Sequence, residues 1–184
     1  MVRIAECEIL IVPGLGNSDE EHWQSRWEGK IKSARRVQQA DWDKPNVDAW
    51  VATIRRDIKA AQKPVIIVAH SLGVHAVVHA VAEPWDMDVK GAFLVTPPSE
   101  NYLQDNAVFD RAFLPVPRAP LRFPSVVVAS RNDEHGGYDD IADLALAWGS
   151  RLVDAGEVGH VNSAAGFGPW PEGMMSFAGF LSKL

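Results

Sequence analysis

The segment 65–82 constrains the fold of this chain more than any other stretch of its sequence. Residues 65–69, which follow Pro64, are apolar and mostly β-branched, and this pattern predicts a buried strand. Residues 72–82 are apolar on almost every side of a helical wheel, which predicts a buried helix. One hydroxyl, that of Ser71, lies between them. A buried strand that passes directly into a buried helix predicts a parallel sheet covered on both faces.

Two interpretations of Ser71 fit this junction. A sharp turn from strand to helix with a serine at its corner is typical of a nucleophile elbow, which exposes the hydroxyl at the top of the sheet. The turn requires small residues two positions away on either side, and Ala69 and Gly73 meet this requirement, although glycine is the usual residue at the first position. The alternative is an ordinary helix N-cap, a role that serine often fills.

The composition of the chain narrows its class. A length of 184 residues, with 47% hydrophobic and 23% charged residues, suits one globular domain. The net charge of −6 argues against a nucleic-acid-binding protein, which would carry a basic patch. Cys7 is the single cysteine, so an internal disulfide is excluded. The sequence contains no apolar run of membrane-spanning length and no targeting segment, so we expect no membrane association and a cytoplasmic location.

The pattern of apolar segments predicts one α/β domain over residues 1–184. A helix is expected from Ser18 or Asp19 to about Lys32, and another from Pro171 to the end. The long irregular segment 97–124 is expected to hold a short helix near 105–113. Six strands alternate with the helices and predict a mostly parallel sheet with helices on both faces, at residues 8–12, 35–40, 65–69, 91–96, 125–130 and 151–155.

A glycine-containing loop, residues 13–18, follows the first predicted strand. The pair Gly14 and Gly16 is compatible with a dinucleotide-binding fingerprint, but that fingerprint needs a third glycine where Asp19 stands. A phosphate-binding Gly-Lys-Ser/Thr sequence is also absent. The backbone N–H groups of such a loop can instead stabilise an oxyanion.

Three polar residues follow three different predicted strands: Ser71, Asp133 and His160. Because the carboxyl ends of parallel strands meet at one edge of a sheet, we expect these side chains to lie close together. Their order along the chain is that of the α/β-hydrolase triad, in which histidine deprotonates serine and the acid orients the imidazole. The backbone N–H groups of Leu72 and Leu15 are the predicted oxyanion hole.

Three further residues are predicted to contact substrate. His22 lies near the glycine loop, and Phe109 and Phe113 lie in the irregular segment 97–124. This segment has fewer than 30 residues and must also connect two strands, so little chain remains for a lid. The sequence therefore predicts a shallow acyl cleft that favours short acyl chains.

Two histidines are compatible with a metal site. His75 and His79 are four residues apart on the helix after Ser71, which is the spacing of a zinc-ligand pair. A third ligand such as His70 or Glu83 would be required, and the helix is predicted to be buried. We therefore expect no metal.

Several stretches of the chain resemble a known family of small serine hydrolases, typified by retinoblastoma-binding protein 9 and its bacterial YdeN-like relatives. The resemblance extends from Glu8 to Leu184. It implies a compact α/β-hydrolase core without a large cap, a triad of Ser71, Asp133 and His160, and no cofactor. It is carried by residues 12–14 with 22–28, 41–42 with 45, 69–73, and 159–162 with 166–173.

Two functions follow as hypotheses. The first is a serine hydrolase that cleaves carboxylic esters of small substrates through an acyl-enzyme. The second is a protein-interaction module that keeps the α/β-hydrolase fold with weak or vestigial activity. Under the first hypothesis the partner is a small-molecule ester, and neither nucleic acid nor membrane is expected. A protein partner is possible but cannot be identified from the sequence.

Overall fold

The computed structural model describes residues 6–84 and 86–184. Within these ranges six strands form one sheet in the order β2-β1-β3-β4-β5-β6, and every neighbouring pair is parallel. The prediction of a six-stranded α/β sheet is therefore confirmed. The strands are β1 (Glu8–Val12), β2 (Ala34–Arg36), β3 (Val65–His70), β4 (Val89–Val95), β5 (Ser125–Ala129) and β6 (Arg151–Asp154).

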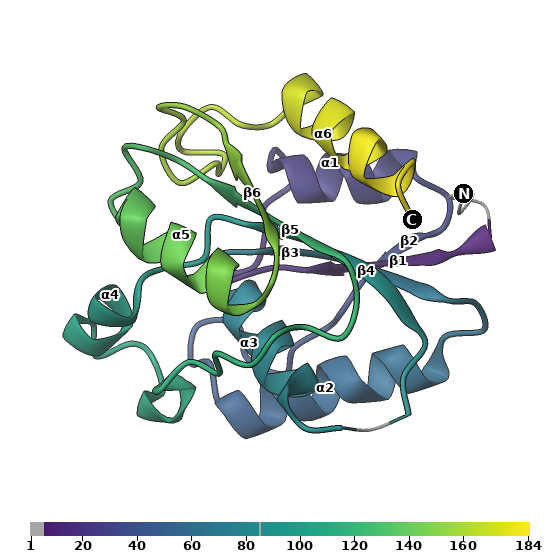
Figure 1. Cartoon of the computed structure of the whole chain (residues 1–184), viewed down its shortest axis with the longest axis horizontal. Coiled ribbons are helices and arrows are strands. Elements are labelled where there is room, and N and C mark those ends of the chain that lie inside the picture. The colour runs from purple at the N-terminus through teal and green to yellow at the C-terminus, as the bar shows by residue number, and fades with distance from the viewer. Residues whose placement is uncertain (1–5, 85) are drawn as a thin grey trace.

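Helices cover both faces of the sheet (Figure 1). Helices α1 and α6 lie on one face, and α2 and α3 lie on the opposite face (Figure 1). Apolar side chains of α5 join the core on the α2 and α3 side. No helix in the described ranges is long and apolar enough to cross a bilayer, and the cytoplasmic location stays a prediction. The helices are α1 (Trp23–Lys30), α2 (Val47–Ala60), α3 (Leu72–Ala82), α4 (Glu100–Asp105), the 3₁₀ helix η2 (Arg111–Phe113), α5 (Tyr138–Ala147) and α6 (Pro171–Leu181).

The buried strand β3 and helix α3 explain the long apolar run in the sequence. Strand β3 lies between β1 and β4, and all six of its residues are buried. Helix α3 packs closely over the end of β1 at Gly73. A Cβ atom at this position would lie 2.5 Å from the carbonyl oxygens of both Val12 and Pro13. Glycine is therefore required here for a close approach of helix to strand.

The start of α1 differs from the prediction. The helix begins at Trp23, and its N-cap is His22, whose Nδ1 accepts a hydrogen bond from the Gln24 N–H. Asp19 does not cap the helix, because its Oδ1 accepts hydrogen bonds from the N–H groups of Glu21 and His22 in a separate turn. Strand β2 is also shorter than expected, since its pairing with β1 ends at Arg36.

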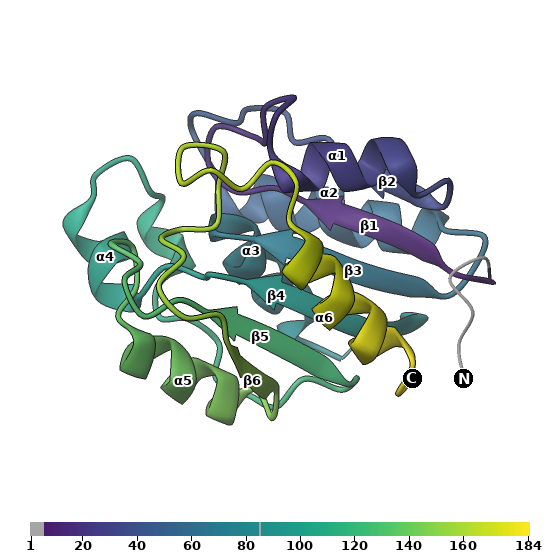
Figure 2. The ribbon, with the colours of Figure 1, turned by 90° about the horizontal axis from the view of Figure 1, so that it is seen from above.

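The irregular segment between β4 and β5 also differs from the prediction. Its α-helix, α4, ends at Asp105, so the prediction of a helix near 105–113 is wrong. Ser99 determines the earlier start, because its Oγ accepts a hydrogen bond from the Tyr102 N–H at 3.1 Å. Only the short helix η2 falls inside the expected range, and Asp110 caps it by accepting from the Ala112 N–H at 3.0 Å. As a result α4 and the chain after it lie on the side of the molecule where the strands of the sheet have their carboxyl ends (Figure 2).

Candidate active site

Ser71 occupies a strained turn between β3 and α3. Its backbone has φ 55° and ψ −131°, a left-handed conformation that non-glycine residues rarely adopt. Among the described residues, its side chain makes no capping hydrogen bond to α3. The Ser71 Oγ lies instead 2.8 Å from Nε2 of His160. This geometry is that of a nucleophile elbow and not of an ordinary N-cap.

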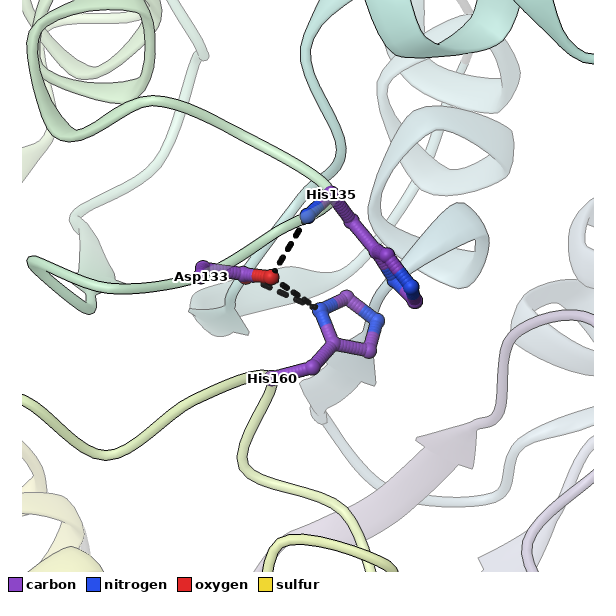
Figure 3. Close-up of side chains that lie close together, drawn as sticks. All are labelled: Asp133, His135 and His160. Carbon is purple, nitrogen blue, oxygen red and sulfur yellow. Dashed lines mark hydrogen bonds and ion pairs between the residues drawn. The ribbon is translucent and has the colours of Figure 1, made fainter.

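A chain of hydrogen bonds connects Ser71 to an aspartate through His160. Nδ1 of His160 lies 2.9 Å and 3.0 Å from the two carboxylate oxygens of Asp133. A carboxylate accepts hydrogen bonds, so Nδ1 carries the proton and Nε2 is free to accept the proton of Ser71. The Asp133 side chain is only 2% exposed, and its Oδ1 also accepts from the His135 N–H at 2.9 Å (Figure 3). The structure therefore brings the three predicted residues together.

The loop after β1 lies directly against this turn. A Cβ atom added at Gly14 would lie 2.8 Å from Cβ of Ser71 and 3.1 Å from the backbone nitrogen of Leu72. Leu15, the next residue, lines the cavity in front of Ser71. The glycine thus allows the loop to approach the start of α3, so the predicted N–H donors Leu15 and Leu72 come from two segments that meet beside Ser71.

A cavity of about 210 Å³ opens above Ser71. Of the residues predicted to contact substrate, His22 and Phe109 line it. Phe113 does not, because it is fully buried in the core, where its ring packs against Trp50. The lining residues are Leu15, Asn17, Asp19, His22, His70, Ser71, Tyr102, Phe109, His135, His160, Asn162 and Ser163.

A larger cavity of about 450 Å³ lies elsewhere, between β6 and α6. Its lining is mainly apolar and includes Val153, Phe167 and Trp170. None of Ser71, Asp133 and His160 lines it, so size alone does not identify the reactive site. We therefore assign the candidate active site to the smaller cavity.

Three further histidines, His22, His70 and His135, line the same cavity as His160, and the sequence predicted only His22 to contact substrate. Burial lowers the pKa of His22 to about 4, lowers that of His135, and holds that of His70 well below its usual range. The rings of His70 and His135 lie 4.9 Å and 3.9 Å from the His160 ring. His135 also stacks on Tyr102 at 4.5 Å. The lowered pKa values favour uncharged rings at neutral pH, so these histidines line the cavity beside His160 without adding positive charge.

One group of metal-capable side chains occurs in the described residues: Asp133, His135 and His160, whose ligand atoms lie within 4.8 Å of one another. The hydrogen bonds of Asp133 to His160 and to the backbone of His135 account for this proximity. The zinc-like pair in α3 has a different role. Nε2 of His75 and of His79 each donates to a backbone carbonyl oxygen, at 2.7 Å and 3.0 Å.

Together, the fold and the site define a class of protein. A parallel sheet with serine after β3, an acid after β5 and histidine after β6 is the α/β-hydrolase arrangement. Residues 9–179 match the serine hydrolase family, and the chain belongs to that family. It is therefore a hydrolase.

Solved structures support this assignment. The chain is 35% identical to a protein described as a YdeN-like hydrolase from Pectobacterium atrosepticum SCRI1043, over 97% of this chain and 92% of that one, with a TM-score of 0.84. It shares its fold with the ydeN gene product of B. subtilis, at 20% identity, 95% and 98% coverage and a TM-score of 0.75. It also shares its fold with the esterase domain of a Rhodothermus marinus protein, at 13% identity, 94% and 86% coverage and a TM-score of 0.65. No curated protein matches the sequence significantly.

Proposed function

We propose that this hydrolase is a carboxylesterase that cleaves small esters through a covalent acyl-enzyme. The hydrogen-bonded chain from Ser71 through His160 to Asp133 carries the proposal, because these are the groups that serine-dependent acyl transfer requires. Ser71 lines a cavity, which gives a substrate access to the hydroxyl.

Acylation of Ser71 uses the hydrogen bonds that connect Ser71, His160 and Asp133 in the structure. The Ser71 Oγ attacks the ester carbonyl carbon while Nε2 of His160 accepts the hydroxyl proton. Asp133 holds the imidazole orientation and stabilises the imidazolium that forms. His160 then donates the proton to the leaving alkoxide, which departs as the alcohol and leaves an acylated serine. Water, deprotonated by His160, then attacks the acyl carbon, the bond from that carbon to the Ser71 Oγ breaks, the carboxylic acid leaves, and His160 returns the proton to the serine oxygen.

The tetrahedral intermediates carry a negative charge on the former carbonyl oxygen. We propose the backbone N–H groups of Leu15 and Leu72 as its donors, since the glycine loop packs against the start of α3. Each donor of this type contributes roughly 3 to 4 kcal/mol to transition-state stabilisation. The N–H of Leu72 also lies in the first turn of α3, where the helix dipole favours negative charge.

The cavity walls indicate the substrate class. The lining includes Leu15, Tyr102 and Phe109, whose apolar surface suits a short acyl chain. None of the described residues that line the cavity is lysine or arginine, whereas Asp19 adds a carboxylate. The hydrogen bond from Ser163 lowers the pKa of Asp19, which favours its negative form. We therefore propose a neutral or cationic ester as substrate, and not an anionic one.

Hydrolysis of a series of p-nitrophenyl esters from acetate to palmitate tests this proposal. A cavity of about 210 Å³ is smaller than most ligand pockets, so kcat/KM should fall beyond about four to six acyl carbons. A maximum at ten or more carbons would contradict the proposed cavity. Folded protein that hydrolyses none of the esters would instead favour the interaction module.

A further inference from the structure

The loop that carries His160 has an unusual backbone. Gly159 and Val161, on either side of this histidine, both have left-handed φ values, of 59° and 48°. A β-branched residue such as Val161 adopts this conformation only where the surrounding structure enforces it. The position of His160 therefore depends on contacts that other segments make with this loop.

Two side chains donate hydrogen bonds to the backbone carbonyl oxygen of His160. Nε2 of His70 lies 2.8 Å from this oxygen, and Oγ1 of Thr96 lies 3.2 Å from it. A carbonyl oxygen can only accept, so the Nε2 of His70 carries a proton. His70 is buried, and it immediately precedes Ser71 in the chain. One rigid strand end therefore carries the nucleophile and also binds the backbone of its base.

Neighbouring segments support the same loop. The indole N–H of Trp23 donates to the carbonyl oxygen of Val161 at 2.9 Å, and Oδ1 of Asn132 accepts from the Gly159 N–H at 2.7 Å. These bonds hold the residues before and after His160. The bonds to the His160 carbonyl differ from them because they act on the residue that bears the imidazole.

We propose that His70 is a positioning residue, which fixes the distance between Ser71 and the imidazole of His160 by holding the backbone carbonyl of His160. This inference rests on the proposed esterase function. Thr96 is the weaker of the two supports, since its bond is longer. Loss of the His70 donor releases the strained loop, and the Ser71–His160 separation then varies. Misplacement of about 1 Å can reduce the rate of such a reaction by about 10²-fold.

The test compares two substitutions at His70 with the same two at His75. His70→Leu removes the donor but keeps an apolar group of similar size, whereas His70→Gln keeps an N–H donor at a similar reach. His75 is the matched control, because it is also buried and also donates to a backbone carbonyl oxygen, that of Pro98, at 2.7 Å. Unlike His70, it does not line the active-site cavity. The measurements are kcat and KM for a short ester, the rate of fluorophosphonate labelling, and the melting temperature.

The expected results separate positioning from stability. His70→Leu should lower kcat by 10- to 100-fold and labelling in proportion, with KM within twofold of the wild type. His70→Gln should recover most of the loss. His75→Leu should lower the melting temperature by a similar amount to His70→Leu while kcat stays within twofold. Equal kcat losses in the two leucine variants, or full activity of His70→Leu, would overturn the inference.

A second variant covers the case in which His70→Leu does not fold. Thr96→Val removes the other donor to the His160 carbonyl and keeps the side-chain shape. A fall in kcat of threefold or more in a folded Thr96→Val protein supports the inference, and an unchanged kcat overturns it. Wild-type activity that disappears in Ser71→Ala tests the proposed function separately, so its failure is distinguishable from an error about His70.

Discussion

Replacing Gly73 by alanine should impair both the stability and the activity of the protein. The added Cβ would lie 2.5 Å from the carbonyl oxygens of Val12 and Pro13. Both oxygens belong to the backbone at the end of a central strand, so neither can rotate away as a flexible side chain would. Relief of the clash therefore requires α3 to move away from β1.

The expected losses of stability and of kcat follow from this geometry. An ordinary carbon–oxygen contact is about 1 Å longer than the contact at Gly73, and a close-packed core does not absorb such a shift without cost. Overpacking of this kind typically lowers the free energy of unfolding by about 1–3 kcal/mol. Because Gly73 is two residues from Ser71, the same shift moves the nucleophile relative to His160, and a 10- to 100-fold loss of kcat is expected.

Gly179→Ala provides the matched control. Gly179 lies in α6, and a Cβ added there would meet no described atom within 4 Å. Alanine is favoured over glycine inside a helix, so this variant should gain about 0.5–1 kcal/mol. Urea unfolding followed by circular dichroism and ester hydrolysis by both variants give the comparison. A Gly73→Ala protein that is as stable and as active as the wild type would refute the close-approach argument.

Two further predictions concern the acid and the buried histidines. Asp133→Asn should reduce kcat by about 10⁴-fold, whereas Glu134→Gln should have a mild effect, because Asp133 is the one of these two acids that bonds to His160 in the structure. The reverse ranking would assign the acid role to Glu134. Burial lowers the pKa of His75 to about 4 from 6.5, so the unfolded chain binds its proton more tightly and stability falls as pH decreases through this window. Between pH 7 and pH 5 this histidine should lower the free energy of unfolding by on the order of 2 kcal/mol. Urea unfolding should show a smaller decrease over this pH range in His75→Gln than in the wild type, and an equal decrease would contradict the prediction.

The chain topology explains why three members of the candidate site were predictable. Ser71, Asp133 and His160 each follow a strand, and alternation of strands with helices aligns the carboxyl ends of those strands at one edge. Their proximity then follows from the order of elements alone, without knowledge of side-chain packing. The predicted oxyanion donors Leu15 and Leu72 also implied that the loop after β1 meets the start of α3, and in the structure Gly14 and Gly73 permit this close approach.

Other members of the site depend on contacts that the sequence does not encode locally. His70 binds the backbone of a residue 90 positions away, and no periodic pattern indicates that pairing. Tyr102 and His135 meet in the cavity because Ser99 starts α4 earlier than expected. Phe113 was predicted to contact substrate, yet it lies in the core against α2 and α3. No sequence feature of an aromatic residue in an irregular segment distinguishes packing in the core from contact with substrate.

Fluorophosphonate labelling followed by intact and peptide mass spectrometry tests the central claim most directly. The probe reacts with a serine only where a base activates the hydroxyl and a cavity admits the reagent. We expect one label per wild-type chain, located at Ser71, and no label in folded Ser71→Ala or in His160→Ala. Folded wild-type protein that remains unlabelled, or a label that persists in Ser71→Ala, would contradict it.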